Sequence, residues 1–320
     1  MLRRQLPRLG DARRSLLLAG AVLLLALLPY VADPYWQQLG YRALQLYTLA
    51  TAWNLLAGYG GQTSLGVAAF VGCGAYTMVL LVNHWRWPFI AVLPACAATA
   101  ALFAALLSRP MFRLRGLYFT IGTLAMTEAL RILMVNLTIF GGASGLIVDA
   151  ATPPFYELYW LALLLAAVAE ASVQLMLGLP WSLALRAIRD DEQVAQQIGV
   201  RTFRVKLLCF ALSSCFMGAV GGLQAMKLGA IEPYGSFGLN WTIDALAAVI
   251  IGGLGTRSGP LWGTLLYIGL GEALRGLPEL HGAVAGVIVL LVIRFAPRGL
   301  SGLLSRGLRR QAAVHEVNDG

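Results

Sequence analysis

The sequence is dominated by long apolar runs that are separated by short polar segments. A bilayer core about 30 Å thick is crossed by a helix of about 20 residues, and inside lipid a helix satisfies its own backbone hydrogen bonds. We therefore expect an all-α, polytopic membrane protein with about ten transmembrane helices. The ten runs cover residues 15–32, 42–58, 65–82, 89–108, 117–139, 155–178, 206–228, 241–255, 260–275 and 282–296.

The low content of charged residues excludes most other classes of protein. Only 12% of the 320 residues are charged and 58% are apolar, whereas soluble globular proteins carry about 25% charged residues. A soluble enzyme, a disordered chain and a fibrous protein are therefore excluded. The basic residues form short clusters between apolar runs rather than one folded basic face, which excludes nucleic acid as the expected partner.

The distribution of basic residues predicts the orientation of the chain. Cytoplasmic loops of membrane proteins are enriched in Lys and Arg. If residues 1–14 are cytoplasmic and ten spans alternate, 19 of the 24 basic residues lie on the cytoplasmic side. We expect both termini, including the basic tail at 297–320, to be cytoplasmic. The transmembrane domain then covers 15–296, with 15–32 as an uncleaved first span.

No motif of a hydrolytic or metal-dependent enzyme is present in the sequence. The two lysines, Lys206 and Lys227, do not follow a glycine, so a phosphate-binding GxxxxGK[ST] loop is impossible. There is no HExxH or GxSxG motif, and the four cysteines lie inside apolar runs. We expect a protein that is not an enzyme, with no metal site and no cofactor of its own.

The largest cytoplasmic segment, at about 182–205, predicts an amphipathic helix. Residues 184–198 are good helix formers, with Leu185, Ile188, Ala195 and Ile198 as an apolar stripe and charged residues on the other face. Gly199 is expected to end the helix. Such a helix either lies on lipid headgroups or docks a soluble partner.

Ionisable residues within spans are costly and are either paired or functional. Glu128 and Arg131 are three residues apart in one run, so they lie on one helix face and can pair. The alternative is that they border a substrate path. Glu170 and Asp244 also lie in or near spans, without an obvious local partner.

Glycine-rich segments at 58–76 and 141–145 add a second set of candidates. The first, GYGGQTSLGVAAFVGCGAY, permits tight helix packing, or a broken helix whose Gly60, Gln62, Ser64 and Gly66 line a path. The second is an outer-face turn that provides possible contacts through Gly141, Gly142 and Ser144. GGLGTRSGP at 252–260 weakly repeats GYGGQTSLG at 58–66, as in the halves of some transporters.

Five segments in order resemble one known family of transport proteins. They are WNLLAGYGGQTSLGVAAFVGCGAYT, LRGLYFTIGTLAMTEALRIL, FGGASGL, ALRAIRDDEQVAQQIGV and VIIGGLGTRSGPLWGTLL. Together, over about residues 42–295, they resemble the M-type permease subunit of the high-affinity branched-chain amino-acid ABC importers. The resemblance implies a bacterial inner-membrane importer. Its other parts would be a second homologous permease, two cytoplasmic ATPases that bind ATP and magnesium, and a periplasmic substrate-binding protein.

The family's ATPase-contacting loop corresponds to residues 185–199, which favours the docking interpretation. The resemblance implies polar ATPase contacts from Arg186, Arg189, Asp190, Asp191 and Glu192, and an apolar anchor from Leu185, Ile188, Ala195 and Ile198, up to Gly199. The family often has a histidine after SLG, where this chain has Val67. Any role of that histidine therefore does not transfer.

We expect a permease subunit that moves branched-chain or other small apolar amino acids across the inner membrane. Urea or short-chain amides are alternative substrates, because closely similar permeases serve them. A gradient-driven secondary carrier is a second alternative and would need a titratable relay from Glu128, Glu170 and Asp244. The expected translocation path comprises Gly60, Gln62, Ser64, Gly66, Glu128 and Arg131.

Overall fold

The computed structural model describes residues 33–149 and 152–276, together with residues 26, 29, 30, 284, 286, 287, 290, 291 and 294. The described part is almost entirely helical. The expected first span (15–32) and last span (282–296) lie largely outside the described residues. The segments 1–14 and 297–320 lie wholly outside them.

The long helices are α2 (Pro34–Trp53), α3 (Val67–Trp85), α4 (Phe89–Met111), α5 (Leu117–Asn136), α6 (Phe155–Gly178), α9 (Thr202–Leu228), α11 (Asn240–Gly252) and α12 (Gly259–Ala273). The short elements are the π-helix η1 (Asn54–Tyr59), the 3₁₀ turns η2 (Thr138–Phe140) and η3 (Gly142–Ser144), β1 (Leu146–Ile147), α7 (Trp181–Asp190), α8 (Glu192–Gln197), β2 (Ala230–Ile231) and α10 (Pro233–Ser236). Most of the long helices follow the apolar runs closely, but α2 begins before the expected run 42–58, and that run ends in the π-helix η1.

Six segments of the described chain are long and apolar enough to cross a membrane. Five of them are α3, α4, α5, α6 and α9, and the sixth, Pro233–Gly252, combines α10 and α11. Helix α12 has only 15 residues, and α2 is not among the six. The chain is a multi-pass membrane protein, but the expected count of about ten helices is not confirmed.

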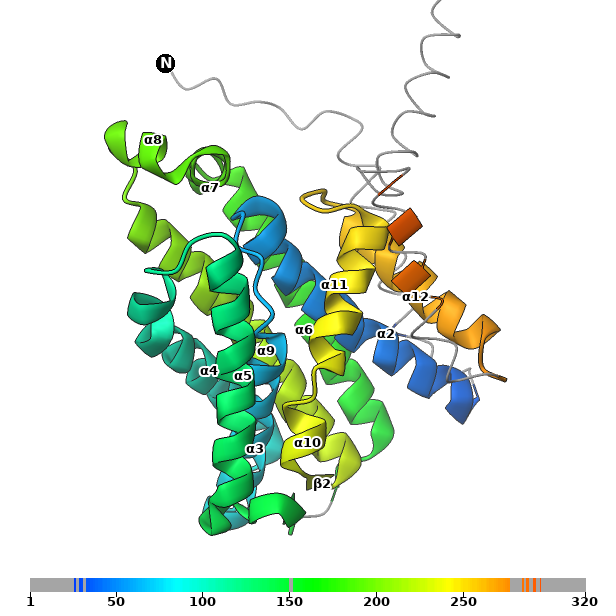
Figure 1. Cartoon of the computed structure of the whole chain (residues 1–320). Coiled ribbons are helices and arrows are strands. Elements are labelled where there is room, and N and C mark those ends of the chain that lie inside the picture. The colour runs from blue at the N-terminus through cyan, green and yellow to red at the C-terminus, as the bar shows by residue number, and fades with distance from the viewer. Residues whose placement is uncertain are drawn as a thin grey trace, which may run out of the picture.

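The short elements gather at two opposite ends of the helix bundle. Figure 1 shows α7 and α8 at one end and β2 with α10 at the other. At the latter end β1 pairs with β2 in antiparallel register, with Leu146 opposite Ile231. We call these the α7–α8 end and the β1–β2 end.

Glycines allow α9 to lie against α3 with their backbones in contact. A Cβ atom on Gly221 would lie 1.9 Å from the carbonyl oxygen of Val71. A Cβ atom on Gly74 would lie 1.9 Å from the carbonyl oxygen of Gly218. Only residues without a side chain fit at such distances, so the predicted tight packing of the glycine-rich run is confirmed. The cysteines are free, and Cys96 and Cys209 are buried among the helices.

Candidate functional site

The expected helix over 184–198 is two helices, because the chain turns at Asp191. Asp191 has extended backbone angles (φ −157°, ψ 114°) between α7 and α8. Its Oδ1 accepts hydrogen bonds from the backbone N–H groups of Gln193 (2.8 Å) and Val194 (3.1 Å). This N-cap satisfies two N–H groups that the first turn of α8 leaves without partners. A short Asp side chain that binds the nearby backbone competes with a continuous helix.

Helix α8 ends at the predicted glycine. Gly199 has φ +87°, its N–H donates to the carbonyl of Gln196, and the N–H of Val200 donates to the carbonyl of Ala195. This pair of bonds is a Schellman motif, which needs a left-handed residue after the C-cap. The prediction that Gly199 ends the helix is confirmed, and the chain is directed into α9.

The apolar stripe of α7 and α8 packs on the helix bundle of the same chain. Leu185 is 1% exposed, and Ile188 and Ala195 are also buried in the hydrophobic core. Ile198, the fourth member of the predicted stripe, is 70% exposed. Three of the four apolar residues therefore fix this unit to its own membrane domain.

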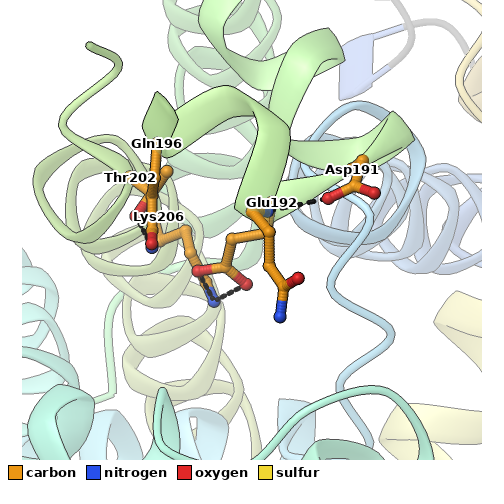
Figure 2. A network of polar contacts seen from close by, with 6 residues as sticks. Asp191, Glu192, Gln196, Thr202 and Lys206 are labelled. Atoms are coloured by element: carbon orange, nitrogen blue, oxygen red, sulfur yellow. Dashed lines mark hydrogen bonds and ion pairs between the residues drawn. The ribbon is translucent and has the colours of Figure 1, made fainter. Parts of the chain in front are cut away.

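Polar side chains also join α8 to the start of α9, as Figure 2 shows. The ammonium of Lys206 lies 3.1 Å from Glu192 Oε1, and the two side chains are only 8% and 27% exposed. The Gln196 amide donates to the Thr202 hydroxyl at 2.9 Å. The Lys206 ammonium also lies 5.1 Å from the ring centre of Phe112. Hydrogen bonds to charged groups are stronger than neutral ones, and these contacts attach α8 to the start of α9.

Arg189 links α7 to the first glycine-rich segment. Its guanidinium donates to the carbonyl of Gly58, at the end of η1, at 2.6 Å. The backbone of Gly61, at φ +68°, passes so close that a Cβ atom there would lie 3.1 Å from the Cα of Arg189. Arg189 is thus committed to a contact within the chain.

The weakly repeated segments 58–66 and 252–260 meet beside α7. The Asn54 side chain donates to the carbonyl of Thr256 at 3.0 Å and accepts from the N–H of Gly255 at 2.8 Å. A Cβ atom on Gly58 would lie 2.6 Å from the backbone nitrogen of Gly255. The weakly repeated segments 58–66 and 252–260 therefore lie side by side at the α7–α8 end. Asn54, a polar residue inside an apolar run, was the available sequence signal for this junction.

Several side chains of α7 and α8 face away from the bundle. Arg186 and Asp190 are exposed, and so are Leu183 (68%), Val194 (51%) and Ile198 (70%). We call these five residues the exposed face of the α7–α8 unit. It combines charges of both signs with apolar side chains, which is typical of a protein-docking surface rather than of an all-basic lipid-binding surface.

The segment 60–66 is irregular backbone held between helices. Trp53 donates its indole N–H to the carbonyl of Ser64 at 2.8 Å, and the Ser64 hydroxyl accepts from the N–H of Gly66 at 3.1 Å. The N–H of Leu65 donates to the hydroxyl of Thr123 on α5 at 3.0 Å. Gln62 is 8% exposed, and its side-chain amide has no hydrogen-bond partner among the described residues.

The predicted ion pair of α5 is present in the structure. Arg131 Nε donates to Glu128 Oε2 at 2.9 Å, and the guanidinium lies 4.8 Å from the ring centre of Tyr234 on α10. The Glu128 side chain is 52% exposed although it lies within a span. The pair borders a cavity of about 300 Å³ between α5 and the segment 234–239. Glu128 and Arg131 thus lie near the β1–β2 end, whereas Gly60, Gln62, Ser64 and Gly66 contact the opposite end of α5 or lie near it.

Glu170 and Asp244 also have partners. The Tyr47 hydroxyl and the Gln174 amide each donate to Glu170 at 2.7 Å. The Tyr267 hydroxyl donates to Asp244 at 2.6 Å. The described residues contain no group of three or more side chains that could hold a metal ion.

The second glycine-rich segment is a tight turn at the β1–β2 end. Gly141, Gly142 and Gly145 have positive φ angles of 80°, 55° and 75°, which glycine adopts without strain. A Cβ atom on Gly145 would lie 1.9 Å from the carbonyl oxygen of Ile231. Ser144 is exposed at the end of η3. The prediction of a turn is confirmed, and its proposed external contact stays a prediction.

Comparison with known proteins identifies one family for this arrangement. The model of the branched-chain amino acid transport system / permease component family matches residues 38–293. The match includes η1, α5, the α7–α8 unit and the 253–258 loop. No solved structure matches this chain.

Individual relatives carry names from the same kind of transporter. The chain is 30% identical over 279 residues to the high-affinity branched-chain amino acid transport system permease protein LivM of Escherichia coli (strain K12), which covers 77% of this chain and 65% of that relative. It is 26% identical over 216 residues to the probable branched-chain amino acid transport permease protein LivM of Methanocaldococcus jannaschii, covering 60% of this chain and 61% of the relative. It is 30% identical over 122 residues to the permease protein LivH of the same Escherichia coli system, covering 37% and 39%. The chain thus spans somewhat less than two thirds of the length of the LivM relatives.

Proposed function

Because the chain belongs to the branched-chain amino acid transport system / permease component family, we propose that it is the membrane permease subunit of an ABC importer. The importer moves branched-chain or other small apolar amino acids across the bacterial inner membrane. Partner ATPase subunits bind and hydrolyse ATP with magnesium, since this chain has no phosphate-binding loop. The observation that carries the proposal is the α7–α8 unit, which is fixed to the membrane domain on one face and open to a partner on the other.

The exposed face of the α7–α8 unit docks onto the cytoplasmic ATPase. Arg186, Asp190 and Ile198 were expected to contact the ATPase. Leu183 and Val194 join them because they are exposed on the same unit. Arg189, Asp191 and Glu192 have a different role, since they hold the unit's shape and its attachment. The α7–α8 end is then the cytoplasmic side, and we propose that both chain termini are cytoplasmic.

ATPase movement reaches the translocation path through direct contacts. Displacement of α7 pulls on the carbonyl of Gly58 through Arg189, and Asn54 carries the displacement to Gly255 and Thr256. The segments 58–66 and 252–260 therefore move together. Because irregular backbone at membrane depth is tolerated where it lines a cavity, these segments form the cytoplasmic gate.

A second, homologous permease subunit covers the exposed face of α5. A charged side chain in the middle of a span costs about 2.5–3.5 kcal/mol on insertion scales when it faces lipid. Glu128 is half exposed in this chain, so α5 faces an aqueous path or a partner rather than lipid tails. The path between the two permeases then runs past Glu128 and Arg131 toward Gln62 and Ser64. Gly141, Gly142 and Ser144 contact a periplasmic binding protein at the β1–β2 end.

The experiment that tests the proposal compares assembly of the native complex with assembly of a surface variant. The tagged chain is purified gently from its native membrane, and stoichiometric companions are identified by mass spectrometry. We expect a second permease and two ATPases. The variant Arg186→Glu/Asp190→Arg, which alters only exposed side chains, is expected to reduce ATPase retention by at least about tenfold.

Arg86→Glu, at the opposite end of the bundle, serves as the matched control and retains the ATPases. Uptake of radiolabelled leucine into cells is measured for all three chains. Full retention and full uptake in the Arg186→Glu/Asp190→Arg variant would contradict the docking assignment. A purified chain that transports leucine alone in liposomes would identify a secondary carrier instead.

A further inference from the structure

A cavity of about 430 Å³ lies at the β1–β2 end, between α2, α3, α9, α10 and α11. This volume is within the range of about 300–1,000 Å³ that is typical of small-molecule sites. Its apolar lining includes Leu46, Leu49, Val71, Ala75 and Trp241. The cavity adjoins the one beside Glu128 and Arg131, because Tyr234 and Gly238 line both, and it therefore lies at the side of the proposed path.

Two basic side chains line this cavity. Arg42 projects from α2 and Lys227 from the last turn of α9, and both also line a neighbouring cavity of about 500 Å³. The Lys227 ammonium lies 4.9 Å from the ring centre of Tyr41. Neither residue forms an ion pair with any residue in the described part of the chain. Arg42 is exposed and Lys227 is half-buried, so both cations are open to an anion that enters the cavity.

Acidic and amide side chains line the same cavity. Asp244 accepts a hydrogen bond from Tyr267, which leaves its carboxylate with further acceptor capacity. Glu232 lies beside α10 at the β1–β2 end, and Gln45 and Gln224 add amide groups. One cavity therefore presents cations, carboxylates and an apolar wall. A zwitterion with an apolar side chain has the matching groups.

We infer that Arg42 and Lys227 bind the carboxylate of the transported solute in this cavity. The solute is then an α-amino acid with an apolar side chain rather than a neutral amide such as urea. Asp244 and Glu232 provide the acceptors for its ammonium group. This inference rests on the proposed function and adds the site at which the permease holds its solute.

The test uses a leucine analogue whose side chain carries a photoreactive diazirine. The complex of this chain with its partner subunits is placed in lipid nanodiscs without the binding protein, irradiated, and mapped by peptide mass spectrometry. We expect labelled peptides from α2, α3 or α11. The double variant Arg42→Gln/Lys227→Gln is expected to reduce labelling about 10- to 100-fold, as for the loss of hydrogen bonds to a charged group. Leucine is expected to compete with the label about 10- to 100-fold better than leucinamide, because leucinamide lacks the carboxylate.

Arg86→Gln, an arginine at the same end that does not line the cavity, serves as the matched control and keeps full labelling. Retention of the ATPases by the double variant shows that it folds. Unchanged labelling in that variant, equal competition by leucinamide, or labelling confined to α5 would each overturn the inference.

Two further outcomes separate the possible failures. Normal leucine uptake by the double variant overturns the carboxylate site while the proposed function stands. If the wild-type chain assembles with no ATPase, the proposed function fails. Photolabelling of the chain alone by the leucine analogue then still tests whether the cavity binds the solute. Native mass spectrometry shows whether an anionic lipid stays bound to the wild-type protein and is lost from the double variant. If it does so while leucine labelling is unchanged, the basic pair binds a lipid phosphate and the inference is overturned.

Discussion

The guanidinium of Arg189 donates a 2.6 Å hydrogen bond to the carbonyl of Gly58, a residue 131 positions earlier in the chain. The contact joins α7, which lies outside the candidate membrane spans, to Gly58 near the end of η1. Charge-assisted hydrogen bonds are short and about twice as strong as neutral ones. Through this contact, Arg189 is proposed to transmit movement of α7 to the segment that begins at Gly58.

Arg189→Gln is expected to separate coupling from docking. The neutral, shorter side chain loses the contact with Gly58, so leucine uptake falls roughly tenfold while the ATPases stay bound. Arg186→Gln, one turn earlier on the exposed face, is expected to weaken ATPase retention instead. Uptake, retention and ATP hydrolysis are measured on each complex. Normal uptake by Arg189→Gln would remove Arg189 from the coupling route.

Asp191→Ala is expected to loosen α8 without unfolding the chain. Loss of an N-cap costs about 1 kcal/mol, which corresponds to roughly fivefold faster opening of the first turn. Hydrogen–deuterium exchange of the peptide spanning 192–198 measures this directly. Asp191→Asn can still cap and keeps the wild-type rate, and Asp190→Ala is the exposed neighbour control. An unchanged exchange rate in Asp191→Ala would show that the cap does not stabilise α8.

Local patterns predicted the features that depend on neighbouring residues. Apolar runs of about 20 residues located α3 to α6 because a span needs that length. The stripe of Leu185, Ile188 and Ala195 predicted a buried face, and Gly199 predicted the end of the helix. Each of these signals lies within one continuous stretch of about 20 residues or fewer.

The sequence could not show which long-range partners each polar side chain would find. Residues 184–198 are good helix formers, so the break at Asp191 became visible only through its capping bonds. Glu192 pairs with Lys206, a contact that the sequence did not predict, and its expected contact with the ATPase stays a prediction. The role of Asn54 depends on Gly255, 201 positions away, and no periodicity in the sequence connects them.

Neutralising Glu128 alone is expected to harm the protein more than neutralising both members of its ion pair. Glu128→Gln leaves the Arg131 guanidinium beside Tyr234 without its carboxylate, and an unpaired charge in a span is costly. Glu128→Gln/Arg131→Gln removes both charges. Expression in the membrane and leucine uptake are measured for both variants. Equal losses would mean that the pairing itself contributes nothing.

Gly221→Ala is expected to destabilise the bundle, and Gly269→Ala is its matched control. The new Cβ on Gly221 would lie 1.9 Å from the carbonyl oxygen of Val71, whereas that on Gly269 meets no atom within 4 Å. Overpacking of this kind costs about 1–3 kcal/mol because α3 and α9 must move apart. In an exposed helix position, alanine instead gains up to about 1 kcal/mol over glycine. Thermal unfolding in detergent, followed by size-exclusion chromatography, is expected to show a melting temperature several degrees lower for Gly221→Ala alone. An equal shift in both variants would show that α3 and α9 do not pack through this glycine.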